Sequence, residues 1–206
     1  METEITLVFH NLGLRSFIEV DLCARCPRQD DKGCCGFYSP VFYPTDLVYL
    51  YINEPDLLRH IFSLDHLTIL DASVTVNNVI DGESYRCRFH SQAGGCTLPQ
   101  HLRESVCRHF VCAGIGWMEE DSLQDWRRFF DDLTDYEIET NNRWSEILAD
   151  LGITLRKPEL RDRFFSELVK LYRDNLDNLP DFIKSMPEEE TRTLRRSLVF
   201  GTEWIL

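Results

Sequence analysis

The 206-residue sequence predicts a helix-rich α+β fold, in which a small cysteine-rich region with a β-hairpin packs against a C-terminal helical region. Three observations predict it. Hydrophobic residues make up 43% of the chain, which is enough for a core. All eight cysteines lie in the first 112 residues. Beyond residue 120, apolar residues recur every three or four positions, as in amphipathic helices. We expect 1–116 and 117–206 to be these two regions of one compact unit.

The elements of the first half follow from local patterns. Residues 5–9 and 17–22 are rich in β-branched and aromatic residues and predict strands. Residues 27–36 have loop composition. Two prolines predict short helices over 46–52, with Thr45 as N-cap, and over 56–62.

The second cysteine block lies on a predicted hairpin, a turn and a helix. A β-rich run over 73–80 precedes Asp81-Gly82, a strong signal for a hairpin whose second strand would carry Cys87. Glycines at 94 and 95 place Cys96 on a turn. The run 98–110 predicts a helix with Cys107 near its end and Cys112 just beyond.

The cysteine-free half is expected to be helical throughout. Residues 121–150 predict one amphipathic helix or a helix pair, and a proline at 158 opens another helix. A capping-box pattern at 185–188 predicts a last helix through residue 198.

The net charge of the chain disfavours some functions. The chain has 22 basic and 35 acidic residues, a formal net charge of −13. Phosphate backbones and anionic membrane surfaces would repel such a chain. The sequence has no apolar run of the roughly 20 residues that a membrane span needs. It also begins without the basic segment of a secretory signal. We therefore expect a cytoplasmic protein with no membrane or nucleic-acid partner.

The cysteines form two groups with the spacings Cys-x2-Cys-x7-Cys-Cys and Cys-x8-Cys-x10-Cys-x4-Cys. They are Cys23, Cys26, Cys34, Cys35, Cys87, Cys96, Cys107 and Cys112. Disulfides need an oxidising compartment, and unliganded buried thiols need not cluster. Clustered cysteines in a reducing cytosol favour thiolate ligation of a metal. Six of the nine Lys or Arg residues in 1–112 lie within two residues of a cysteine, which would lower the thiol pKa. His90 and His109 also lie beside cysteines and could complete a coordination position, but hydrogen-bonded surface histidines are the favoured explanation for each of them.

The run from Cys87-Arg88-Phe89 through Gly95-Cys96 to Cys107-Arg108-His109-Phe110-Val111-Cys112 resembles the YkgJ-type cysteine-cluster family, described as having a zinc- or iron-chelating domain. The family's leading cysteine pair and double cysteine also find counterparts in the first group. The resemblance covers about residues 20–115. Two features depart from the pattern: seven residues separate Cys26 from Cys34, and Glu104 stands where the family has a proline.

Iron, an iron–sulfur cluster and zinc all fit this ligand set. Four thiolates suit each of them, and the Cys26-Pro27 pair and the adjacent cysteines favour iron slightly. With iron, we expect redox chemistry or modification of a macromolecule, because flagellin lysine methylases carry a similar cysteine motif. With zinc, the alternative is a structural module that binds a protein partner without catalysis. No catalytic residues are assigned.

Overall fold

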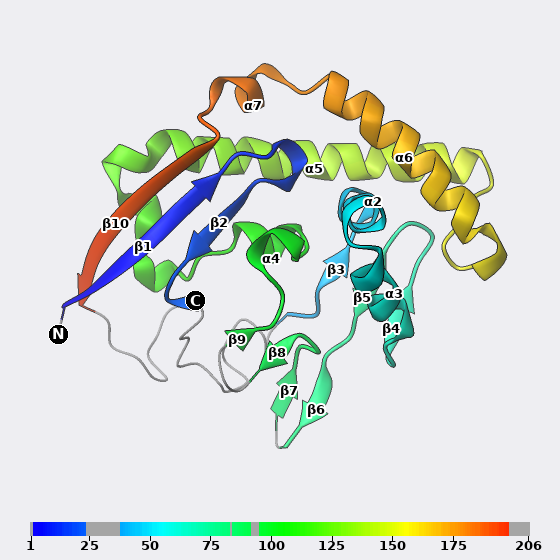
Figure 1. Ribbon diagram of the computed structural model, residues 1–206, viewed down its shortest axis with the longest axis horizontal. Helices are drawn as coiled ribbons and strands as arrows, with labels where there is room; N and C mark the ends of the chain where they lie inside the picture. The colour runs from blue at the N-terminus through cyan, green and yellow to red at the C-terminus, as the bar shows by residue number, and fades with distance from the viewer. Residues whose placement is uncertain (1, 24–37, 83, 92–94, 198–206) are drawn as a thin grey trace.

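The computed structural model describes residues 2–23, 38–82, 84–91 and 95–197, and within them the fold is mixed α+β and rich in helix (Figure 1). The predicted fold class is confirmed at this level. The loop predicted over 27–36 lies outside the described residues.

One three-stranded antiparallel sheet joins the two ends of the described chain. Its order is β10-β1-β2, and the strands are β1 (Glu2–His10), β2 (Phe17–Val20) and β10 (Glu189–Ser197). Alternation explains β1, because Ile5, Leu7 and Phe9 are fully buried on one face. A short 3-10 helix, η1 (Gly13–Arg15), connects β1 to β2.

The helix predicted to start at the 185–188 capping box and run through residue 198 is wrong, because residues 189–197 form strand β10; residue 198 lies outside the described residues. Strand β10 pairs along the whole of β1, with Ile5 opposite Leu194. Glutamate, arginine and leucine favour helix locally, but the open edge of β1 offers backbone hydrogen bonds along nine residue pairs. Leu194 turns its side chain to the core, while most of its neighbours stay exposed.

The long helix α5 (Gln124–Asp150) covers this sheet and reaches the other half of the molecule. Of the two forms predicted for 121–150, the single helix is observed. Trp126, Phe129 and Phe130 pack with Phe9 of β1 in one hydrophobic cluster. Three 3-10 helices lead into α5: η4 (Ala113–Ile115), η5 (Trp117–Glu119) and η6 (Asp121–Leu123).

A second cluster forms around a small sheet of order β3-β5-β4. Its strands are β3 (Val41–Phe42), β4 (Leu67–Ile69) and β5 (Val74–Val76), and helices α2 (Pro44–Asn53) and α3 (Pro55–Ser63) pack beside it. Both short helices were predicted. Thr45 is not the N-cap, because α2 begins at Pro44 with Tyr43 as the capping residue, and Thr45 is buried inside the first turn.

The Asp81-Gly82 hairpin is confirmed as β6 (Val79–Asp81) and β7 (Ser84–Arg86). A second hairpin follows, of β8 (His90–Ser91) and β9 (Gly95–Cys96). The single helix predicted over 98–110 is wrong. It is divided into η3 (Gln100–Leu102) and α4 (Ser105–His109), because Arg103 and Glu104 are extended between them.

The C-terminal half adds η7 (Pro158–Leu160), α6 (Arg161–Asp177) and α7 (Asp181–Ser185). Phe164 and Leu168 of α6 are fully buried against the second cluster, as the predicted face of this helix requires. Trp144 and Leu148 of α5 belong to that same cluster, so α5 contributes to both cores.

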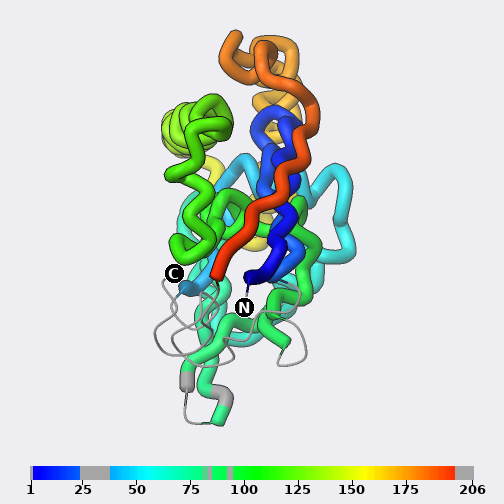
Figure 2. Tube along the Cα trace, turned by 90° about the vertical axis from the view of Figure 1, so that its left-hand side faces the viewer, coloured from blue at the N-terminus to red at the C-terminus, as the bar shows by residue number. Residues whose placement is uncertain are grey.

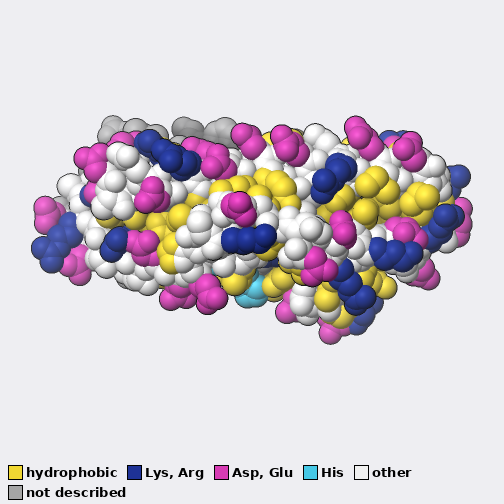
Figure 3. Space-filling model, turned by 90° about the horizontal axis from the view of Figure 1, so that it is seen from above, with side chains coloured by type: hydrophobic (Ala, Val, Ile, Leu, Met, Phe, Trp, Pro, Cys, Tyr) yellow, Lys and Arg dark blue, Asp and Glu magenta, His cyan; other side chains and the backbone are white. Residues whose placement is uncertain are grey.

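The β6–β7 hairpin lies at the opposite end of the molecule from α7 in two perpendicular views (Figure 1, Figure 2). Seen from above, acidic and basic side chains are interspersed with apolar ones (Figure 3). Within the part of the chain that the structure describes, no helix combines the length and apolar character needed to cross a bilayer.

Candidate functional site

Five of the eight predicted ligand cysteines lie on described segments, and all five are half-buried. Cys23 follows β2, Cys87 follows β7, Cys96 lies on β9, Cys107 lies in α4 and Cys112 precedes η4. Cys87 was predicted on the second hairpin strand but lies one residue beyond β7, and Cys96 is on a strand rather than a turn. Cys26, Cys34 and Cys35 lie outside the described residues.

The β8–β9 hairpin brings Cys87 and Cys96 into one neighbourhood. The His90 backbone N–H donates to the Cys87 carbonyl at 3.0 Å, and His90 is paired with Cys96 across the two strands. The Phe89 N–H lies 3.5 Å from the Cys87 sulfur. Backbone N–H groups that point at sulfur are common around thiolate ligands in proteins.

Cys23 and Cys112 pack against the cluster beneath the β10-β1-β2 sheet, whereas Cys87 and Cys96 pack against the other cluster. Within residues 2–23, 38–82, 84–91 and 95–197, no three His, Cys, Asp or Glu side chains form a group that could hold a metal ion. Grouping of all eight cysteines remains a prediction, since three of them fall in the gaps between these ranges.

Glu104 organises the segment around Cys107. Its two carboxylate oxygens accept the N–H groups of Cys107 at 2.7 Å and Val106 at 3.1 Å, so it caps the N-terminus of α4. The Tyr38 hydroxyl lies 3.4 Å from the same carboxylate. Burial raises the pKa of Glu104 to about 7. Glu104, which stands where the family has a proline, thus caps the start of the helix. Its residue type alone did not predict this role.

Arg108 lies within the cysteine motif and is completely buried. It donates to the Ser16 carbonyl of the η1–β2 connection at 2.5 Å and to Glu137 of α5 at 2.7 Å, and it lies 3.7 Å from Asp46. Its positive charge, predicted to lower a thiol pKa, is instead directed at two carboxylates. Arg108 therefore ties α4 to β2 and α5.

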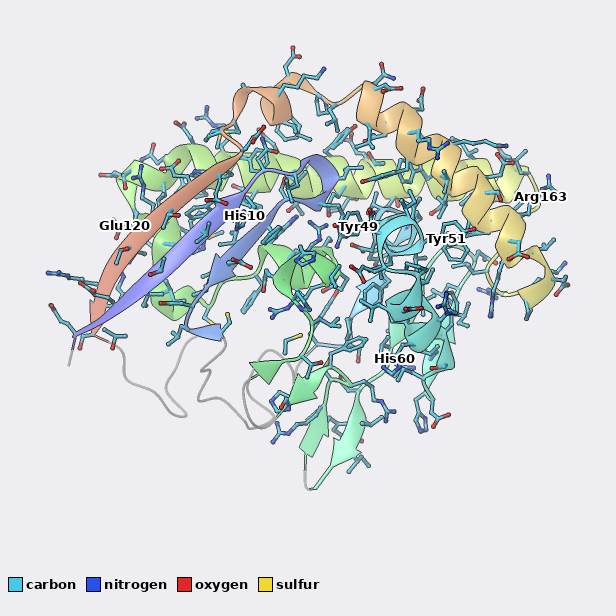
Figure 4. The ribbon with its side chains drawn as sticks, in the orientation of Figure 1. His10, Tyr49, Tyr51, His60, Glu120 and Arg163 are labelled. Atoms are coloured by element: carbon cyan, nitrogen blue, oxygen red, sulfur yellow. The ribbon has the colours of Figure 1, made fainter. Side chains whose placement is uncertain are left out.

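Arg15 forms the other half of this buried network. Its guanidinium contacts Asp46 at 2.5 Å, and it donates to the carbonyls of His101 at 2.6 Å and Arg103 at 3.0 Å. It also lies over the ring of Tyr49, which α2 directs toward α4 (Figure 4). Burial lowers the pKa of Arg15 to about 10.

Together, Arg15, Arg108, Asp46 and Glu137 are all at most 2% exposed and carry two positive and two negative charges. They connect α2, α4, α5 and the η1 segment. No sequence pattern predicts this network, because residues 31 and 29 positions apart pair only once the chain has folded.

His109 turns toward α5. Its ring nitrogens lie 3.4 Å from the Thr134 hydroxyl and 3.8 Å from Glu137, and the ring packs edge-on against Phe130. Burial holds the pKa of His109 well below its usual value. These contacts fit the expectation of a hydrogen-bonded histidine.

Comparisons with family models, with curated proteins and with solved structures find no match to this chain.

Proposed function

We propose that this chain is a metal-binding protein whose clustered cysteines hold iron, an iron–sulfur cluster or zinc, as in the YkgJ-type proteins that it resembles. One observation carries the proposal: all eight cysteines fall between residues 23 and 112 in two spaced groups. Clustering of this kind is typical of thiolate ligands in a reducing compartment.

The described cysteines support this proposal through their surroundings. They come from strand ends, a hairpin and a helix, and half-burial suits ligands that must exclude water yet be reached by an ion. The Phe89 N–H beside the Cys87 sulfur and the Glu104 cap beneath Cys107 hold two of them in fixed positions. Groups that orient ligands from behind tune metal sites as strongly as the ligands themselves.

The same proposal gives the buried ion-pair network a role. Arg108 joins α4, which carries Cys107, to the connection leading into β2, beyond which Cys23 lies. A metal site built from distant segments needs such cross-links, because its ligands must meet within a few tenths of an ångström. Iron would place the protein in redox chemistry or modification of a macromolecule, and zinc in a structural role.

The test is anaerobic purification followed by elemental analysis and an absorption spectrum. Iron with acid-labile sulfide and visible absorption is expected for an iron–sulfur cluster. Zinc without iron would favour the structural module over redox chemistry. A full-length protein that folds and retains neither metal would contradict the proposal.

Single substitutions test the ligand assignment. We expect Cys107→Ala and Cys35→Ala to lower the metal content. The matched control is Val106→Ala, because Val106 lies in the same turn of α4 as Cys107 and is 47% exposed. Full metal content and unchanged stability in both cysteine variants would contradict the assignment.

A further inference from the structure

A cavity of about 740 Å³ runs along α5 beside the cysteine-bearing helix α4. One wall is a stripe of α5 from Thr134 to Ala149. Residues of the β4–β5 turn and of the segment that follows α5 line it as well, and so do Ser105 and Val106 of α4. The fifteen residue-to-residue steps from Thr134 to Ala149 rise by about 22 Å, so the cavity is an elongated groove.

Glu137 is a lining residue of this groove with one unused oxygen. The side chain is 1% exposed, and its Oε1 accepts from Arg108. Its Oε2 is buried and has no hydrogen-bond partner among the described residues. Buried carboxylate oxygens are costly to leave unpaired, so a ligand that donates a hydrogen bond here would be stabilised.

Asn141 provides the complementary group one helical turn further along. Its Oδ1 accepts the Thr45 N–H at 2.9 Å, and its amide nitrogen makes no hydrogen bond within the described part of the chain. Residues four apart lie on the same face of a helix. The groove therefore offers an acceptor, Glu137, beside a donor, Asn141. An amide, which carries one N–H and one C=O, matches both.

The surrounding charges favour a neutral ligand. Arg108 already neutralises Glu137, and Arg15 neutralises Asp46, so a charged group entering here would be buried without a counterion. The charged residues of the rim, Asp71 and Arg156, pair with each other at 3.2 Å. Another part of the rim is apolar, because Tyr43, Leu70, Val106 and Ile138 line the groove and are 41–54% exposed.

We propose that this groove binds an extended polypeptide segment with apolar side chains, and that Glu137 and Asn141 recognise its backbone amides. A length of about 22 Å accommodates six or seven extended residues at about 3.3 Å each. The inference goes beyond metal binding and does not depend on it, since none of the groove residues named above is a proposed ligand.

The first test is a titration of the purified full chain, followed by nuclear magnetic resonance. The probe is an acetylated heptapeptide of alternating threonine and leucine. We expect saturable shifts at the α5 residues of the groove. Methylating alternate backbone nitrogens, which removes donors, should weaken binding about tenfold, the equivalent of one good hydrogen bond. The absence of saturable shifts, or equal binding of the methylated peptide, would overturn the proposal. So would binding of maltoheptaose in place of the peptide.

Variants locate the contact. Asn141→Asp keeps the oxygen that accepts from Thr45 and removes the donor, so we expect about tenfold weaker binding. Asn178→Asp makes the same change in charge at an exposed position outside the groove and should bind as the wild type does.

A second pair of variants tests the proposal if Asn141→Asp fails to fold. Ile138→Asp alters the exposed rim and should weaken binding, whereas Ile147→Asp, on the same helix but outside the groove, should not. Equal affinities for these two variants would also overturn the proposal.

Discussion

Replacing Asp46 by asparagine tests the buried ion-pair network most directly. Asparagine has nearly the same shape, but it removes the negative charge that faces Arg15 at 2.5 Å and Arg108 at 3.7 Å. Arg15 is 2% exposed, so its charge cannot turn to water. Removing one partner of a buried ion pair costs about 3–5 kcal/mol. In a chain of this length the melting temperature should fall by roughly 10 °C.

The assay is urea and thermal unfolding followed by circular dichroism, with the metal content of each sample matched. The control is Asp56→Asn in the neighbouring helix α3. Asp56 pairs with Arg59 at a site where both side chains are more than 70% exposed, so its loss should change stability by no more than about 0.5 kcal/mol. If Asp46→Asn is no more destabilising than Asp56→Asn, the interpretation of Asp46 as the anchor of the network is refuted.

Three further predictions concern single positions. Glu104→Ala removes the cap of α4, so we expect a loss of about 1–2 kcal/mol in urea unfolding; a change below the measurement error would contradict the cap. Gly152→Ala should cost about 1–2 kcal/mol, because φ is +69° at a position with open space around it, and a stabilised variant would show that φ is not what matters there. Burial raises the pKa of Tyr172 above its unfolded value near 10, so the unfolded chain loses the proton first and stability should fall as pH rises above about 10. The stability of the Tyr172→Phe variant should fall less over that pH range. Identical pH profiles of stability for the variant and the wild type would contradict the assignment of this effect to Tyr172.

Much of the fold could be predicted because its signals are local. The β-branched and aromatic residues of 5–9 predicted β1, and Asp81-Gly82 predicted the hairpin. The spacing of aromatic and leucine residues predicted α5 and α6. For α5 and α6, the pattern that predicts the helix is also the one that buries its apolar face.

Two helix predictions were wrong, one because the segment pairs with a distant strand and the other because of a local cap. Residues 189–197 carry good helix formers, and only the open edge of β1 makes them a strand. The 98–110 segment divides because Glu104 leaves the helical conformation to accept two backbone N–H groups. The sequence contains both segments, but it does not show which groups they will contact.

The candidate site was predictable only in part. Cysteine spacing predicts the ligand set, and five of its members lie half-buried on described segments. The pairing of Arg15 with Asp46 and of Arg108 with Glu137 had no sequence signal, because charged residues are common and their partners lie about thirty residues away. The roles of Asn141 and Glu137 could not be predicted either, because the amphipathic pattern of their helix was interpreted from its apolar residues alone.

X-ray absorption at the metal edge of the anaerobically purified protein tests the central proposal most directly, because it counts sulfur neighbours rather than metal atoms. Thiolate ligation by the clustered cysteines predicts a dominant sulfur shell, at about 2.3 Å if the metal is zinc. The Cys107→Ala variant should lose part of that shell, while Val106→Ala should keep it. A metal surrounded only by nitrogen and oxygen, or a folded protein with no bound metal, would contradict the account.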